Sequence, residues 1–156
     1  MNDADFPNGC RFAGDSCWSD ATPRQLLTAV GHVALTLPSP RSFSFLGLNT
    51  VRGDPHRDEP DAAFSMWGSV LFGAYGFWSE PREDRQHVDW VQSMLQSAEP
   101  LKVGYYVGEA DRSVKPGRAR ECFSPSAWRK LTALKEQYDG QAGARGRKAV
   151  NPARFG

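Results

Sequence analysis

The stretch VLFGAYGFW, residues 70–78, is the longest apolar run in the chain, and SEP at residues 79–81 follows it directly. The run has the length of a β-strand and is far too short to span a bilayer as a helix. Gly68 and Ser69 separate it from a second apolar run, Ala62–Trp67. Because both runs are strand-length and glycine permits a tight turn, we predict that they form a β-hairpin.

The residues that follow this stretch predict an amphipathic helix. It begins near Glu80 and ends before Pro100, and Val88, Val91 and Leu95 recur within it at helical spacing. These three side chains would form one buried stripe along the helix. The apolar stretch is therefore expected to lead directly into a helix that packs on the sheet.

The C-terminal part predicts a further strand, Leu101–Val107, and a last helix, Ser124–Asp139. Ser124 is suited to cap the helix, and Gly140 is expected to end it because glycine favours the position just past a helix. Residues 141–156 are basic and rich in glycine and alanine, so we expect a flexible tail.

Upstream of the stretch, the sequence predicts a strand over residues 9–18, a helix that starts near Pro23, and a strand over Ser42–Val51. Residues 1–8 are mostly polar and are expected to be frayed. The order of elements indicates an α+β fold, in which an antiparallel sheet carries its helices mainly on one face. One domain is predicted over residues 9–140.

Composition limits the classes of function. The chain has 156 residues, a formal net charge of +1 and 40% hydrophobic residues, which is typical of a globular domain and gives no strong field to attract nucleic acid or an anionic membrane. The acidic start MNDAD lacks the features of a secretory signal, so a cytoplasmic protein is expected. Neither the three cysteines nor the three histidines show a metal-ligand spacing, so we predict no metal site.

The residues GYYVG at positions 104–108 are the best local candidate for chemistry. Two adjacent strand residues point to opposite faces, so one of Tyr105 and Tyr106 can pack while the other presents its hydroxyl to a cleft. Both could equally be ordinary sheet aromatics. A cluster of aromatic residues is open to two interpretations: it could line a pocket for a flat ligand, or it could be the core of the sheet. Its members are Phe64, Trp67, Phe72, Tyr75, Phe77 and Trp78.

Several segments, taken in order, resemble the C-terminal part of berberine-bridge-type FAD-linked oxidases. The matching residues are Trp78, Trp90, the GYYVG strand at 104–108, and the helix RKLTALKEQYD at 129–139. The resemblance implies a sheet that lies over the isoalloxazine of FAD and forms the pocket for a small-molecule substrate. It also implies that Tyr106 is a catalytic and cofactor-contacting residue and that Gly108 lies beside the cofactor.

With these implications, we expect Phe64, Trp67, Tyr75 and Trp78 to line the substrate pocket. The chain departs from the family pattern at Gly108, where the family has asparagine, and a separate FAD-binding domain is absent from these residues. We therefore expect a protein that is inactive without an FAD-binding domain supplied in trans, or one that self-associates through an exposed apolar face. The alternative is a stand-alone α+β module that binds a small ligand or a protein without redox activity, or a non-functional remnant.

Overall fold

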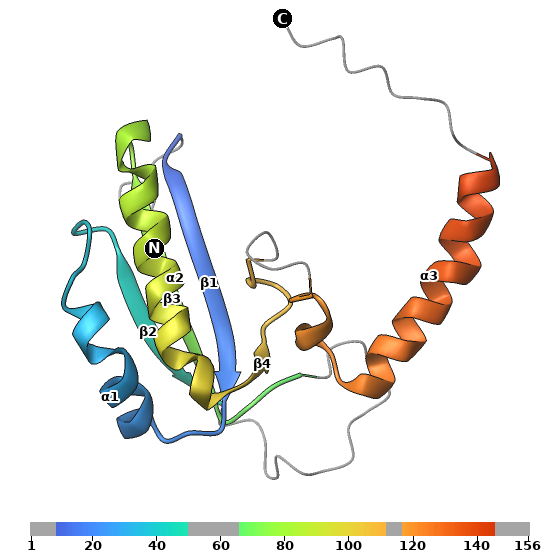
Figure 1. The fold of residues 1–156 in the computed structure, drawn as a ribbon, viewed down its shortest axis with the longest axis horizontal. Coiled ribbons are helices and arrows are strands. Elements are labelled where there is room, and N and C mark those ends of the chain that lie inside the picture. The colour runs from blue at the N-terminus through green and yellow to red at the C-terminus, as the bar shows by residue number, and fades with distance from the viewer. Residues whose placement is uncertain (1–8, 50–65, 112–116, 146–156) are drawn as a thin grey trace, which may run out of the picture.

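The structure is a computed structural model that describes residues 9–49, 66–111 and 117–145. In Figure 1 the chain runs from β1 in blue to α3 in red. The described strands are β1 (Arg11–Ser19), β2 (Phe43–Leu48), β3 (Val70–Trp78) and β4 (Lys102–Tyr105), and the described α-helices are α1 (Pro23–Ala34), α2 (Asp84–Ala98) and α3 (Pro125–Arg145).

The strands form one antiparallel sheet in the order β2-β3-β1-β4. β3 pairs along its whole length with β1, and its other edge pairs with β2 through Val70–Tyr75. The predicted hairpin between Ala62–Trp67 and β3 is therefore wrong, because β1 and β2 occupy the edges of β3. Residues 66 and 67 are not in a strand, and residues 62–65 lie outside the described residues.

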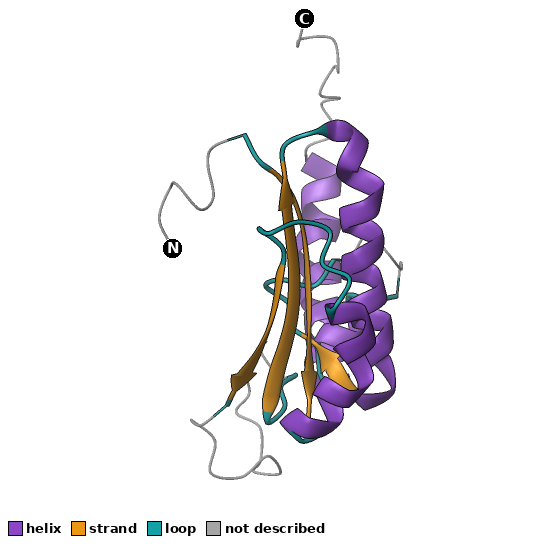
Figure 2. Ribbon diagram, turned by 90° about the vertical axis from the view of Figure 1, so that its left-hand side faces the viewer, coloured by secondary structure: helices purple, strands orange, loops and turns teal. Residues whose placement is uncertain are grey.

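The helices α1 and α2 lie on the same face of the sheet, as Figure 2 shows. The side chains that this packing buries come from both helices and from the inward positions of the strands, and include Cys17, Leu26, Val30, Phe72, Ala74, Trp90, Val91, Met94 and Leu95. The prediction of an α+β fold with helices mainly on one face is confirmed. We call the opposite face of the sheet, which neither α1 nor α2 covers, the open face.

The start of α2 is fixed to the sheet by a cluster around Trp78. The Trp78 indole N–H donates to the Asp84 carboxylate at 2.6 Å, and Arg11 on β1 pairs with the same carboxylate. The ring of His87 stacks on Trp78 with 4.5 Å between ring centroids. The last residue of β3 thus sets where the next helix begins.

We predict that His87 makes the stability of the fold depend on pH. Its side chain is only 1% exposed, and burial lowers its pKa below the ordinary 6.5, although the nearby Glu83 and Asp84 oppose this effect. The unfolded chain then binds a proton at a higher pH than the folded chain, so stability is full above about pH 6.5 and falls as the pH drops below it. Urea unfolding from pH 5 to pH 8 should show this loss.

The substitution His87→Gln should flatten the pH dependence, and His32→Gln, at an exposed position of α1, is the control. Gly76 lies close to the His87 ring, so the variant keeps a side chain of similar reach to avoid opening a cavity. An identical pH profile for the parent chain and the His87 variant would refute the prediction.

The helix α3 leaves the sheet and extends away from it (Figure 1). It continues to Arg145, so the expectation that Gly140 ends it is wrong. A glycine inside a helix costs only about 1 kcal/mol, which does not suffice to end it. On its described part, Leu134 is 40% exposed and Tyr138 is 63% exposed, so the apolar side of α3 faces solvent.

Candidate functional site

The open face carries a layer of aromatic rings centred on Tyr75. We call it the aromatic layer; its members are Phe12 on β1, Phe43 and Phe45 on β2, and Tyr75 and Phe77 on β3. The Tyr75 ring lies 5.3 Å from Phe43, 5.8 Å from Phe45 and 6.1 Å from Phe12, with interplanar angles of 28°, 7° and 23°. The three rings around Tyr75 are thus close to parallel with it, whereas the rings of Phe12 and Phe77 are tilted by 44° to each other.

Two glycines beneath the aromatic layer allow its rings to lie close to the sheet. A Cβ on Gly73 would be 2.6 Å from the Phe45 ring and 2.8 Å from the Tyr75 ring, and a Cβ on Gly14 would be 2.6 Å from the Tyr75 ring. Carbon atoms in contact normally lie about 3.5–4.0 Å apart. Any side chain at Gly14 or Gly73 would therefore push the rings away from the strands.

The hydroxyl of Tyr75 is the polar group within this layer. It donates a short hydrogen bond to the carboxylate of Glu109, an exposed residue in the turn that follows β4. Burial raises the pKa of Tyr75, and the bond to Glu109 raises it further. The phenol is therefore protonated at neutral pH, and its oxygen keeps lone pairs that can accept a further hydrogen bond.

Two more polar atoms are buried near the aromatic layer. Ser16 is fully buried opposite Gly73 and its side chain acts to lower the pKa of Tyr75, although its hydroxyl makes no hydrogen bond of ordinary geometry within the described residues. Trp18 points to the same face from β1, and its buried indole nitrogen has no hydrogen-bond partner among the described residues. Buried polar atoms are usually paired in proteins, so orphan atoms indicate a place where a ligand or water can bind.

Tyr105 and Tyr106 point to opposite faces of the sheet, as the strand spacing predicts. Tyr105 is buried on the helix side. Tyr106 meets the edge of the Trp18 ring at 6.1 Å between centroids, and its own ring lies against Gly108, where a Cβ would be 3.0 Å from it. The geometry thus places Tyr106 and Gly108 together at the β4 end of the open face, and their roles toward a cofactor remain predictions.

The predicted pocket residues that the structure describes do not share one face. Tyr75 lies on the open face, whereas Trp78 faces α2 and contacts His87. Trp67 is half-buried in the segment before β3, and Phe64 lies outside the described residues. Of the three described residues, only Tyr75 belongs to the aromatic layer.

A second candidate region lies on the helix side, where Asp15 and Arg118 form a buried ion pair. Their nitrogen and oxygen are 2.6 Å apart, and each side chain is at most 5% exposed. The Asp15 carboxylate also accepts from the backbone N–H groups of Ser16 and Asp111, and Arg118 donates to the Asp111 carbonyl. Burial raises the pKa of Asp15, and the charge of Arg118 opposes that rise. The pair holds the segment after β4 against β1.

The ring of Tyr105 lies within this region between two cations. The charged groups of Lys102 and Arg118 are 4.1 Å and 4.0 Å from its centroid. Its hydroxyl donates to Glu99 at 2.8 Å, and Lys102 pairs with Glu99 and Glu121. The charged groups of this region are thus paired with one another, as a structural network requires.

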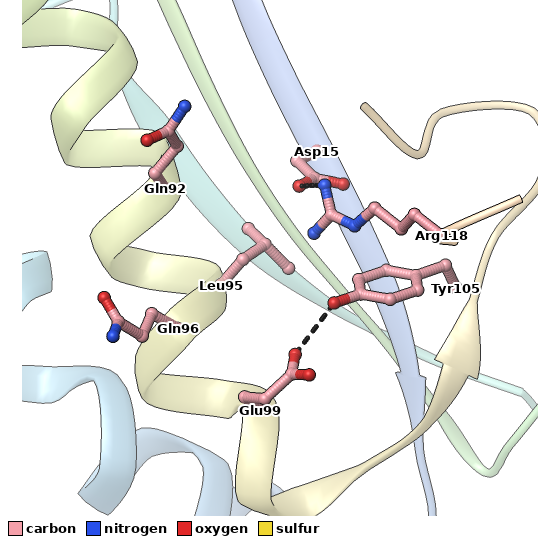
Figure 3. Close-up of a pocket in the computed structure, with 7 residues that line it drawn as sticks. All are labelled: Asp15, Gln92, Leu95, Gln96, Glu99, Tyr105 and Arg118. Atoms are coloured by element: carbon pink, nitrogen blue, oxygen red, sulfur yellow. Dashed lines mark hydrogen bonds and ion pairs between the residues drawn. The ribbon is translucent and has the colours of Figure 1, made fainter. Parts of the chain in front are cut away.

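A cavity of about 240 Å³ lies beside this network, as Figure 3 shows. Its lining is Asp15, Gln92, Leu95, Gln96, Glu99, Tyr105 and Arg118. It is smaller than most ligand pockets, and each of its charged groups has at least one partner, although Arg118 Nε has none among the described residues. We therefore regard the open face, whose aromatic rings are accessible, as the better candidate site.

Sequence reasoning missed both polar pairs because each joins residues that are far apart in the chain. Asp15 occupies an inward position of a strand, and a buried acid needs a cationic partner. The inward position of Asp15 was the one feature of the sequence that could have indicated a buried ion pair, although it does not identify Arg118 as the partner. For the Tyr75–Glu109 pair, the sequence offers no comparable signal.

The described residues contain no group of three or more potential metal-ligating side chains. None of the described helices combines the length and apolar character that a membrane span requires.

The fold is shared with part of a flavin-dependent enzyme. The solved structure of CrmK, described as a flavoenzyme involved in shunt product recycling in caerulomycin biosynthesis, matches 90% of this chain with a TM-score of 0.70 and 16% identity, over 32% of CrmK. At that identity the likeness concerns the fold alone.

A curated protein adds a likeness in sequence. The FAD-linked oxidoreductase nodO of Hypoxylon pulicicidum is 23% identical over 141 residues, which make up 90% of this chain and 30% of nodO. No protein-family model matches the chain. The chain thus resembles part of an FAD-linked oxidoreductase and spans about a third of the length of the proteins it matches.

Proposed function

We propose that this chain is the substrate-side part of an FAD-dependent oxidoreductase of the berberine-bridge type. In this proposal the open face covers the isoalloxazine ring and forms one wall of the substrate pocket. The observation that carries it is the aromatic layer, which the chain's own helices α1 and α2 leave uncovered. The likeness to part of nodO supplies the flavin class.

The residues present fit a flat cofactor. The rings of Phe43, Phe45 and Tyr75 are nearly parallel, and aromatic faces stack well on a conjugated ring. FAD, when bound, would accept the two electrons that leave the substrate. The chain's own residues would orient the substrate and exclude water from it, with Tyr106 and Gly108 at the β4 end of the site.

Activity would need an FAD-binding region besides the residues of this domain, either in a longer protein or in a separate chain. The described fold offers an open sheet face but no enclosed site for the pyrophosphate and adenosine. Phe12 is 55% exposed on the open face, and such exposed apolar surface is typical of a surface that another domain covers. An FAD-binding partner is the occupant we propose, and self-association through the same face is the competing outcome.

Riboflavin, which carries the isoalloxazine ring alone, provides the test of this function. We expect the full chain to quench riboflavin fluorescence with weak affinity, with a Kd of about a millimolar, because half of the site is missing. The substitution Phe45→Ala should weaken the binding several-fold. Leu35→Ala, which changes an exposed side chain just past α1, is the matched control.

Equal quenching by the parent chain, the Phe45 variant and the Leu35 variant would contradict a flavin site on the open face.

The alternative, a stand-alone interaction module, is favoured by one observation, the exposed apolar side of α3 at Leu134 and Tyr138. That alternative gains support if riboflavin does not bind and the chain associates with itself through α3, as sedimentation of a Leu134→Ser variant would reveal.

A further inference from the structure

We infer that Asp15 and Arg118, which lie on the helix side of the sheet, are positioning residues for the open face. They fix the turn after β4 and so keep the Glu109 carboxylate on the Tyr75 hydroxyl. We call residues 106–111 the edge turn. The inference rests on the proposed function only in that Tyr75 belongs to the face assigned there to a ligand, and its test needs neither flavin nor substrate.

The edge turn passes around β1 from one face of the sheet to the other. β4 pairs with β1 only through Cys17–Ser19, so β4 leaves the rest of that edge uncovered. Glu109 reaches Tyr75 on the open face, whereas Asp111, two residues further along the chain, contacts Asp15 on the helix side. One short segment therefore touches polar groups of both faces.

The helix-side pair holds both backbone polar groups of Asp111. The Asp111 N–H donates to the Asp15 carboxylate at 3.2 Å, and the Asp111 carbonyl accepts from Arg118 at 2.7 Å. Asp15 and Arg118 are themselves joined at 2.6 Å, with side chains at most 5% exposed, and Figure 3 shows them beside each other in the wall of the cavity. Because buried partners hold both groups, this end of the edge turn is fixed.

Glu109 needs an anchored backbone to keep its bond to Tyr75. It is exposed, and Gly108 directly before it has more backbone freedom than other residue types. The N–H groups of Glu109 and Ala110 donate to the Tyr106 carbonyl at 3.1 Å and 2.8 Å, which closes the turn at its first residue. A glutamate side chain loses rotamer freedom when it binds a partner, so an exposed bond of this kind persists only where the backbone beneath it is fixed. Release of the anchor should therefore separate Glu109 from Tyr75.

The state of this bond can be read from the reactivity of the phenol. Burial is the largest cause of the raised pKa of Tyr75, and Glu109 raises it further through its hydrogen bond and its charge. The charge of Asp15 acts in the same direction, and the Ser16 side chain opposes them. Loss of Glu109 should thus lower the pKa and increase the phenolate fraction. Tetranitromethane nitrates the phenolate form of tyrosine, and the exposed Tyr138 on α3 is the internal reference.

The experiment measures nitration at Tyr75 relative to Tyr138 in the full chain at pH 8, by mass spectrometry of its peptides. Glu109→Gln should raise this ratio by about tenfold, since the phenolate fraction rises as the pKa falls. The double variant Asp15→Val with Arg118→Met replaces the ion pair with apolar side chains and leaves no unpaired buried charge. It should raise the ratio to about the same extent, although Glu109 is present. Adding Glu109→Gln to the double variant should then change the ratio by less than about twofold.

The matched controls are Arg120→Met in the same segment and Glu136→Gln on α3. Both change exposed side chains and should keep the parent ratio. The amide NMR spectrum of each variant shows whether it is folded. A folded double variant with the parent ratio would overturn the inference. An undiminished effect of the double variant on top of Glu109→Gln would overturn it too, because Asp15 would then act on Tyr75 through its charge alone.

A second variant keeps the test decisive if the double variant does not fold. Asp15→Asn with Arg118→Leu is a smaller change on β1 that still frees the Asp111 carbonyl, and it should raise the ratio several-fold. The parent ratio in this variant, or in Glu109→Gln, would remove the positioning role. Riboflavin does not enter this measurement, so a failed flavin site leaves the positioning role standing, and an unchanged ratio leaves the flavin site standing.

Discussion

Replacing Arg118 by leucine should lower the free energy of unfolding by about 3–5 kcal/mol, the largest single effect we expect in this fold. Arg118 is 4% exposed and lies 2.6 Å from the Asp15 carboxylate. Its removal leaves that carboxylate buried without a cation, and it also removes one of the two cations that flank the Tyr105 ring. Chemical denaturation followed by tryptophan fluorescence measures the change.

A double variant separates the ion pair from simple loss of packing. Asp15→Asn together with Arg118→Leu should be less destabilised than Arg118→Leu alone, because no unpaired charge stays buried. Arg120→Leu changes an exposed arginine in the same segment and should have an effect below about 0.5 kcal/mol. If Arg118→Leu were no more destabilising than Arg120→Leu, the network would not hold the segment after β4 in place.

We expect Gly73→Ala to have the second-largest effect on the free energy of unfolding. It should disturb the open face more than the core. The added methyl group would lie 2.6 Å from Phe45 and 2.8 Å from Tyr75, so the aromatic rings must move. Overpacking of this kind costs about 1–3 kcal/mol. The near-ultraviolet circular dichroism of the rings should change.

Gly47→Ala on β2 is the matched control for this change. It lies on the same face, but its Cβ would meet Phe45 at 3.5 Å, an ordinary contact distance. We expect little change in the ring spectrum. A Gly73→Ala variant with the ring spectrum of the parent chain would show that the rings do not depend on the glycine beneath them.

The fold class could be predicted from the sequence because its signals are local. The apolar stripe Val88, Val91 and Leu95 located α2, although Val88 is only half-buried. Alternation along the chain correctly placed Tyr105, the last residue of β4, and Tyr106 on opposite faces. The hairpin prediction failed because Ala62–Trp67 has the composition of a strand, whereas strand pairing is decided by partners elsewhere in the chain. β1 and β2 occupy the two edges of β3, and nothing near residue 70 reveals this.

The candidate site was predictable only in part for the same reason. Tyr75 was among the aromatic residues expected to line a pocket, but its partner Glu109 joins it through the fold and not through a motif. Trp78 belongs to the same aromatic run, yet three positions along a strand reverse the face to which a side chain points. Composition therefore identified the aromatic residues without separating those of the open face from those of the core.

The sheet order β2-β3-β1-β4 affects how the chain can fold during its synthesis on the ribosome. β1 is made first of the described strands, yet it takes an interior place in the sheet, and its neighbours β3 and β4 are made much later. Until then both of its edges lack their final partners, and distant pairings of this kind slow folding. β1 therefore lacks its final partners while most of the domain is translated, and during that time its open edges can pair with other chains and aggregate.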